Sequence, residues 1–142
     1  MKTTITTNEL ININEDKYRD LFESNRDSIT IFRIDSEGNA GNFIEANTAT
    51  TDFFGYSKEE LLTVNINDIE SLSEEEKNSR IAVLKSEGKI DFETIIKDKS
   101  GIERNVEIKT VLINYDNQPA VMNITRDITA RKLIEENSRK AH

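Results

Sequence analysis

The residues best suited to a functional role lie near the C-terminus, in the segment Arg126-Asp127-Ile128-Thr129-Ala130-Arg131. Asp127 and Arg131 are four positions apart, the spacing at which two side chains meet on one face of a helix, and Thr129 is a residue type that caps helix starts. We expect Asp127 to accept backbone hydrogen bonds and to pair with Arg131, joining the last strand to an outgoing helix as a signal relay. A plain helix cap with a surface ion pair worth under about 1 kcal/mol would have the same sequence pattern.

The sequence offers little support for catalysis or for a bound cofactor. It has no Cys, and its only His is His142, the last residue, which excludes haem held by an internal His, Cys-linked chromophores and a structural zinc site. Phosphate-binding glycine loops and a nucleophile beside a plausible base are missing as well. The many carboxylates occupy caps, turns and outward strand positions, which is typical of a solvated surface. We predict that the chain is not an enzyme and holds no cofactor or metal, although a noncovalent small ligand is compatible with it.

Length and charge narrow the class of protein further. The chain has 142 residues, with 19 Lys and Arg against 27 Asp and Glu and a formal net charge of −8 at pH 7. This length is typical of one domain with short flanking segments, and this charge repels phosphate backbones, so we expect no nucleic-acid partner. The apolar runs are far too short to span a bilayer, and the N-terminus lacks the apolar core of a signal peptide. We therefore expect a cytoplasmic domain, either free or as the cytosolic part of a membrane-associated protein.

Hydrophobic periodicity predicts which elements hold these residues in place. The expected order is a helix, two strands, several short helices, three strands and a final helix. Residues 1–14 are polar and are expected to form a flexible tail. The helices are expected from residue 15, over 47–54, from 57, over 67–72, over 73–88 and from 129, and the strands over 29–34, 42–45, 90–97, 103–113 and 120–126.

Local signals mark the ends of the short helices. The segments Ser57-Lys58-Glu59-Glu60 and Ser73-Glu74-Glu75-Glu76 are spaced as capping boxes. Gly55 and Gly88 each follow an expected helix, where glycine readily takes the left-handed conformation of a C-cap.

The predicted fold class is α+β, because consecutive strands pair most simply as antiparallel hairpins and the helices between them must cover one face of the sheet. Short helices pack incompletely, so we expect a small interior cavity. Few polar side chains are expected in this cavity: only Thr94, Thr110 and Asn123 would offer polar groups, if they point inward. The candidate pocket residues, which fit a plain apolar core equally well, are Ile31, Phe54, Leu61, Ile69, Ile81, Leu84, Phe92, Ile108, Met122 and Ile124.

The two terminal helices are candidates for dimer contacts. Tyr18, Leu21 and Phe22 form one apolar face on the first helix, which we expect to cover the second face of the sheet, either in its own subunit or across a homodimer. On the final helix, residues 130, 134, 137 and 141 have the 4-3-4 spacing of a coiled-coil seam, although Ile134 is the only large apolar residue among them. This pattern fits a parallel dimer helix that continues into a longer protein, and it fits a frayed end equally well.

Three segments together resemble the PAS family of sensor modules. They are residues 43–49 (FIEANTA) with 53–61 (FFGYSKEEL), residues 92–94 with the turn at 98–101 (DKSG), and residues 123–132 (NITRDITARK). The resemblance implies a PAS-like, profilin-like domain over residues 15–128, with a five-stranded antiparallel sheet in the order 2-1-5-4-3, short helices on one face and a C-terminal signalling helix starting at 129.

It also implies a sensory input domain of a multidomain signalling protein such as a sensor histidine kinase. Such a domain would sense a small molecule or act through homodimerisation, and it would pass the signal to a downstream output domain. The alternative is a ligand-free dimerisation module in a signalling or transcription-regulatory protein. Fold resemblance alone does not choose between them.

Overall fold

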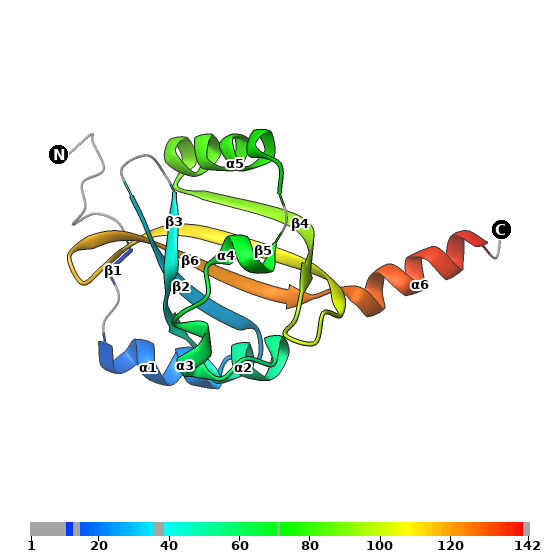
Figure 1. The fold of residues 1–142 in the computed structure, drawn as a ribbon, viewed down its shortest axis with the longest axis horizontal. Helices are drawn as coiled ribbons and strands as arrows, with labels where there is room; N and C mark the ends of the chain where they lie inside the picture. Colours follow the sequence, from blue (N-terminus) through cyan, green and yellow to red (C-terminus); the bar gives the residue numbers. More distant parts are fainter. Residues whose placement is uncertain (1–10, 13–14, 36–38, 71, 141–142) are drawn as a thin grey trace.

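One sheet organises the fold (Figure 1). The computed structural model describes residues 11–12, 15–35, 39–70 and 72–140. Counted from the second strand, β2, the five long strands lie in the order 2-1-5-4-3, each antiparallel to its neighbours, so the predicted sheet is confirmed. These strands are β2 (Ser28–Ile34), β3 (Ala40–Ala46), β4 (Lys89–Lys97), β5 (Glu103–Tyr115) and β6 (Gln118–Asp127).

A sixth, two-residue strand comes from the segment expected to be a tail. Ile11–Asn12 forms β1 and pairs in parallel with Ile113 and Asn114, near the end of β5. The other residues expected in that tail, 1–10 and 13–14, lie outside the described part of the chain.

The turn of the β5–β6 hairpin fixes which residues of the two strands lie opposite each other. Asp116 and Asn117 form its turn with φ angles of 54° and 61°, the left-handed conformations that a two-residue type I′ turn requires. From this turn the pairing runs back along both strands and places Thr110 opposite Asn123.

The short helices begin and end where their caps predict. Both predicted capping boxes are present, at Ser57 before α3 (Lys58–Leu61) and at Ser73 before α5 (Glu74–Glu87). Gly55 closes α2 (Thr48–Phe54) at φ 79°, where a residue with a side chain would be strained. The short helix expected over 67–72 is α4 (Ile66–Ile69), which begins one residue earlier because Asn65 caps it, and which ends at Ile69.

The larger core lies between the sheet and helices α2 to α5. Its buried residues are apolar side chains from both layers, whereas a smaller cluster on the second sheet face is built around Ile31, Ile113 and Ala120. Figure 1 shows α5 along one end of the sheet, α4 across its face and α2 and α3 at the other end. The larger cluster contains Phe32, Phe43, Ala46, Phe54, Leu61, Ile69, Leu84, Ile96, Val106, Ile108 and Val121.

The first helix, α1 (Glu15–Ser24), packs less completely than predicted. Phe22 is buried, but Leu21 on the same predicted face is 71% exposed, and the side chain of Tyr18 lies outside the described part of the structure. The helix contacts α2, and Arg19 reaches Glu45 on β3 at 3.5 Å. Phe22 therefore anchors α1, while Leu21 faces solvent in the single chain.

The last helix, α6 (Thr129–Lys140), projects away from the body of the fold (Figure 1). Leu133 and Ile134 on it are exposed, and residues 141–142 lie outside the described range. None of the helices in the described ranges has the length and apolar content needed to cross a bilayer.

Candidate functional site

The junction between β6 and α6 is held by Asp127, but not through the predicted partner. One Asp127 carboxylate oxygen accepts a hydrogen bond from the backbone N–H of Thr129 at 2.8 Å, as expected. The predicted ion pair with Arg131 is wrong, because Arg131 instead contacts Glu93 at 2.8 Å and Glu135 at 3.8 Å. Asp127 is the last residue of a strand, so a four-residue spacing does not place it on a helix face with Arg131.

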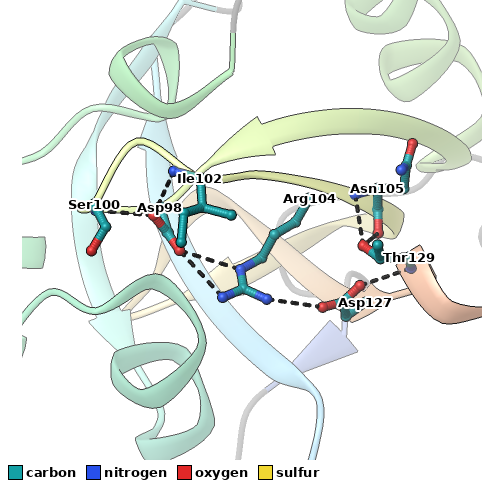
Figure 2. A network of polar contacts seen from close by, with 7 residues as sticks. All are labelled: Asp98, Ser100, Ile102, Arg104, Asn105, Asp127 and Thr129. Atoms are coloured by element: carbon teal, nitrogen blue, oxygen red, sulfur yellow. Dashed lines mark hydrogen bonds and ion pairs between the residues drawn. The ribbon is translucent and has the colours of Figure 1, made fainter.

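The actual partner of Asp127 is Arg104, near the start of β5 (Figure 2). Arg104 donates two hydrogen bonds of 3.3 Å to one oxygen of Asp98 and one of 3.4 Å to Asp127. Its guanidinium carbon also lies 5.3 Å from the centre of the Phe53 ring on α2, within the range of a cation–π contact. One side chain thus joins the β4–β5 turn, the end of β6 and α2.

Asp98 is the buried member of this network. Its side chain is 8% exposed, and its second oxygen accepts the backbone N–H groups of Ser100 at 2.9 Å and Ile102 at 3.0 Å (Figure 2). The turn at this position agrees with the sequence prediction, which did not include Arg104. A usable signal was present, because Arg104 shares the inward face of β5 with Val106 and Ile108, and a charged residue in such a position needs a partner.

The first turn of α6 is attached to two further strands. The Thr129 hydroxyl accepts a hydrogen bond from the N–H of Asn105 on β5 at 3.1 Å, and the N–H of the buried Ile128 donates to the Asn105 carbonyl at 2.8 Å. Glu93 on β4 receives both Arg131 and Lys132, the latter at 2.7 Å. All three predicted relay positions therefore contact the sheet.

These contacts also lower the pKa values of two carboxyl groups, those of Asp127 and Glu93. Partial burial of Asp127 favours its neutral form, but hydrogen bonds from Thr129 and the charge of Arg104 outweigh this and hold the pKa of Asp127 below its usual value. The hydrogen bond from Lys132 likewise lowers the pKa of Glu93. Both groups are therefore ionised, and able to hold α6, throughout the neutral range.

A cavity of about 250 Å³ lies between the sheet and helices α4 and α5. Its floor is formed by inward residues of five strands, and its roof by residues of α5 and of the segment around α4. No three His, Cys, Asp or Glu side chains are grouped to hold a metal ion within the described ranges. The sheet residues on its wall are Phe32, Ile34, Ala40, Ile90, Phe92, Thr110, Val121 and Asn123.

A comparison with known protein families identifies the kind of domain that contains this cavity and this junction. A family described as PAS domain matches residues 26–130, which is most of the chain and spans both the cavity and the junction. The chain belongs to the PAS domain family. A PAS domain is a sensor module, so the cavity and the α6 junction are its candidate input and output sites.

Relatives of this PAS domain occur in sensor proteins. It is 28% identical over 124 residues to the methyl sulfide methyltransferase-associated sensor of Methanosarcina acetivorans, covering 85% of this chain but only 12% of that protein. Among solved structures it resembles the PAS domain of an HTR-like protein from Haloarcula marismortui, with a TM-score of 0.67 and 22% identity over 80% of this chain and 91% of that one. A PAS domain from a two-component sensor histidine kinase matches at a TM-score of 0.63 and 20% identity, over 80% and 96% of the two chains.

The ten predicted pocket residues divide into three groups in this PAS domain. Ile81, Leu84 and Phe92 line the cavity. Four others, Phe54, Leu61, Ile69 and Ile108, belong to the surrounding core without forming the cavity wall.

The remaining three predictions, Ile31, Met122 and Ile124, are wrong, because these residues lie on the opposite face of the sheet. Val121 and Asn123 line the cavity, so by strand alternation their neighbours Met122 and Ile124 face away from it. Ile31 pairs with Met122 and belongs to the second apolar cluster.

The polar part of the cavity wall was partly anticipated. Thr110 and Asn123 do line it, joined by a hydrogen bond of 2.7 Å, whereas Thr94 does not. Arg80 on α5, which was not among the predicted residues, contacts both oxygens of Glu70 at 3.1 Å. The Arg80 guanidinium also lies over the Phe92 ring, 3.5 Å from its centre.

Proposed function

We propose that this PAS domain is the sensory input domain of a multidomain signalling protein, most simply a sensor histidine kinase. In this proposal a small molecule enters the cavity, and the resulting change in the sheet reaches an output domain through α6. Because the chain spans only 12% of its curated relative, catalytic activity is assigned to other parts of such a protein and not to this domain.

One observation carries the proposal: the strands that form the cavity wall are the strands that hold α6. β5 contributes Thr110 to the cavity and Arg104 to the junction, and β6 contributes Asn123 and Asp127 in the same way. Packed elements of this kind transmit displacements because protein interiors are close-packed and deform little.

A cavity-filling variant tests the connection without requiring the natural ligand. Ile81→Phe adds volume inside the cavity, whereas Val83→Phe on the same helix places a ring at an exposed position and serves as the matched control. We expect Ile81→Phe, but not Val83→Phe, to change amide hydrogen exchange in the first turn of α6. Combining Ile81→Phe with Arg104→Gln should reduce that change. Identical α6 exchange in the wild type and in Ile81→Phe would contradict the proposal.

The ligand-free dimerisation module is a second candidate, supported by a separate observation. Leu21 on α1 and Leu133 and Ile134 on α6 are large apolar residues exposed to solvent in the single chain. Dimer contacts through the terminal helices would bury them. Sedimentation equilibrium of the wild type, Leu21→Glu and Ile134→Glu distinguishes the candidates: a dimer broken by these changes, with no ligand effect on α6, favours the module.

A further inference from the structure

The cavity contains a buried amide whose hydrogen-bonding capacity is only partly used. The Asn123 side chain is 5% exposed and lies on the cavity wall, on the central strand β6. Its amide oxygen accepts a hydrogen bond from the Thr110 hydroxyl at 2.7 Å, whereas its amide nitrogen has no hydrogen-bond partner among the described residues and is not fully buried, so it is open to the cavity. Turning the amide over exchanges donor and acceptor without satisfying both atoms.

An amide in this position favours a ligand that can bond to it. A ligand that fills the cavity removes water from the amide nitrogen of Asn123, and leaving that nitrogen unpaired would then be unfavourable, so a ligand atom that accepts its hydrogen bond is favoured over an apolar one. Phe32 and Val121 on the sheet and Ile81 and Leu84 on α5 form an apolar part of the same cavity wall, whereas the polar residues Asn39, Asn67 and Asn78, which also line it, are exposed to solvent. The site therefore suits one polar group on an apolar molecule.

The charged residues at the cavity favour a neutral ligand. The cation Arg80 is already neutralised by Glu70, which is buried, and its guanidinium is stacked on Phe92. An anionic ligand would have to displace Glu70 and leave its carboxylate buried without a partner, which is strongly unfavourable. Lys77 is also paired, with Glu74 at 3.7 Å.

The size of the cavity limits the ligand further. Its 250 Å³ corresponds to about eight water molecules at about 30 Å³ each, and an engineered cavity of about 150 Å³ in another protein holds benzene. A single ring with a short substituent fits this space.

We propose that the cavity binds a small, neutral, mostly apolar molecule through one hydroxyl, carbonyl or amide group held by Asn123. This inference rests on the proposed sensory function, because it names the ligand class of the same cavity.

Three probes of similar size separate the alternatives: benzyl alcohol, which carries a hydroxyl able to donate and accept; toluene, which lacks it; and benzoate, which is anionic. Binding is followed by ¹H–¹⁵N NMR titration of the purified chain, with amides of the cavity strands as reporters. We expect benzyl alcohol to bind between about twofold and tenfold more tightly than toluene, as one net hydrogen bond allows, and benzoate to bind most weakly.

Two variants assign the effect to the proposed residues. Thr110→Val combined with Asn123→Leu replaces both hydrogen-bonding partners by apolar groups of similar shape, which keeps the pair from leaving a lone buried donor. It should remove the preference for benzyl alcohol over toluene. Glu70→Gln should strengthen benzoate binding by freeing the charge of Arg80, with little effect on benzyl alcohol.

The outcomes separate this inference from the proposed function. If benzoate binds the wild type most tightly, or if the double variant keeps the benzyl alcohol preference, the ligand class is wrong while the cavity remains a binding site. If none of the three probes perturbs the cavity amides, both the ligand class and the ligand-sensing function are overturned.

Discussion

Replacing Arg104 by Gln should destabilise the domain far more than replacing an ordinary surface arginine. Gln keeps much of the side-chain length but removes the charge and the forked donor group. The change eliminates both 3.3 Å hydrogen bonds to Asp98, the 3.4 Å contact with Asp127 and the cation–π contact with Phe53.

The expected magnitude follows from how buried each partner is. Asp98 is 8% exposed and keeps two backbone donors, so losing Arg104 leaves a buried carboxylate partly satisfied rather than bare. Hydrogen bonds to charged groups contribute about 1.5–3 kcal/mol, and the lower end applies because Arg104 itself is 33% exposed and screened by water. The exposed contact with Asp127 adds under about 1 kcal/mol. We expect the free energy of unfolding to fall by about 2 kcal/mol.

Urea denaturation followed by circular dichroism measures this loss. The matched control is Arg126→Gln, which removes an arginine–aspartate pair with Asp27 at 3.1 Å in which the arginine is 63% exposed. That variant should lose much less stability than Arg104→Gln, because water screens an exposed ion pair. A double-mutant cycle of Arg104→Gln with Asp98→Asn should show a coupling energy of about 1 kcal/mol or more. A loss for Arg104→Gln no larger than the control's, or a coupling energy near zero, would refute the reasoning.

Three further outcomes are expected. Asn47→Ala should lower the free energy of unfolding by about 3 kcal/mol or more in urea denaturation, because this fully buried side chain hydrogen-bonds four backbone groups; a loss under 1 kcal/mol would contradict it. Glu93→Gln should speed amide exchange in α6 with little change in global stability, since it releases Lys132 and Arg131 from an exposed site; unchanged exchange would show that these contacts do not hold the helix. The pKa of Asp127 is depressed in the folded state, so its contribution to stability is present above the unfolded value of 3.8 and is lost as the pH falls through the lower folded value. An NMR titration of the Thr129 amide should therefore have its midpoint below pH 3.8, and a midpoint at or above it would be contrary evidence.

The helices and their ends could be predicted because their signals are local. A capping box needs only residues three positions apart, so Ser57 and Ser73 mark the starts of α3 and α5 whatever the rest of the chain does. The left-handed residues at Gly55 and Gly88 are equally local. The order of the elements then restricts the sheet to few arrangements.

The cavity wall was harder to predict because the side-chain alternation along β6 is misleading. Its inward positions include Asn123 and Thr125, while Met122 and Ile124 point outward, which reverses the usual pattern of apolar inside and polar outside. Partners from other strands and helices make polar residues possible here: Asn123 is hydrogen-bonded by Thr110 on β5. Ser28 on β2, which pairs with Thr125, shares a 2.8 Å hydrogen bond with Thr50 on α2. Those partners are distant in sequence, so the strand alone does not show which face is buried.

The partner of Asp127 was missed for the same reason. A spacing of four residues suggested Arg131, but the side chain that reaches Asp127 is 23 residues earlier, on the neighbouring strand. Val106 is the residue that pairs directly with Asp127, so Arg104 is the next residue along the same face of β5. Diagonal cross-strand neighbours of this kind are within reach of long side chains, and finding them requires the register, which the turn at Asp116 and Asn117 sets.

The alternation of side chains along β4 gives the cavity a second connection to α6. Phe92 lines the cavity on the inner face, and the next residue, Glu93, holds Arg131 and Lys132 on the outer face. Consecutive residues share a rigid peptide unit, so a ligand that shifts the backbone at Phe92 also shifts the backbone that carries Glu93. β4 is paired only with β5 among the described strands, and an edge strand is freer to move than a central one. A ligand that displaces Phe92 would therefore reach α6 through β4 more easily than through the central strand β6, where displacement must move neighbours on both sides.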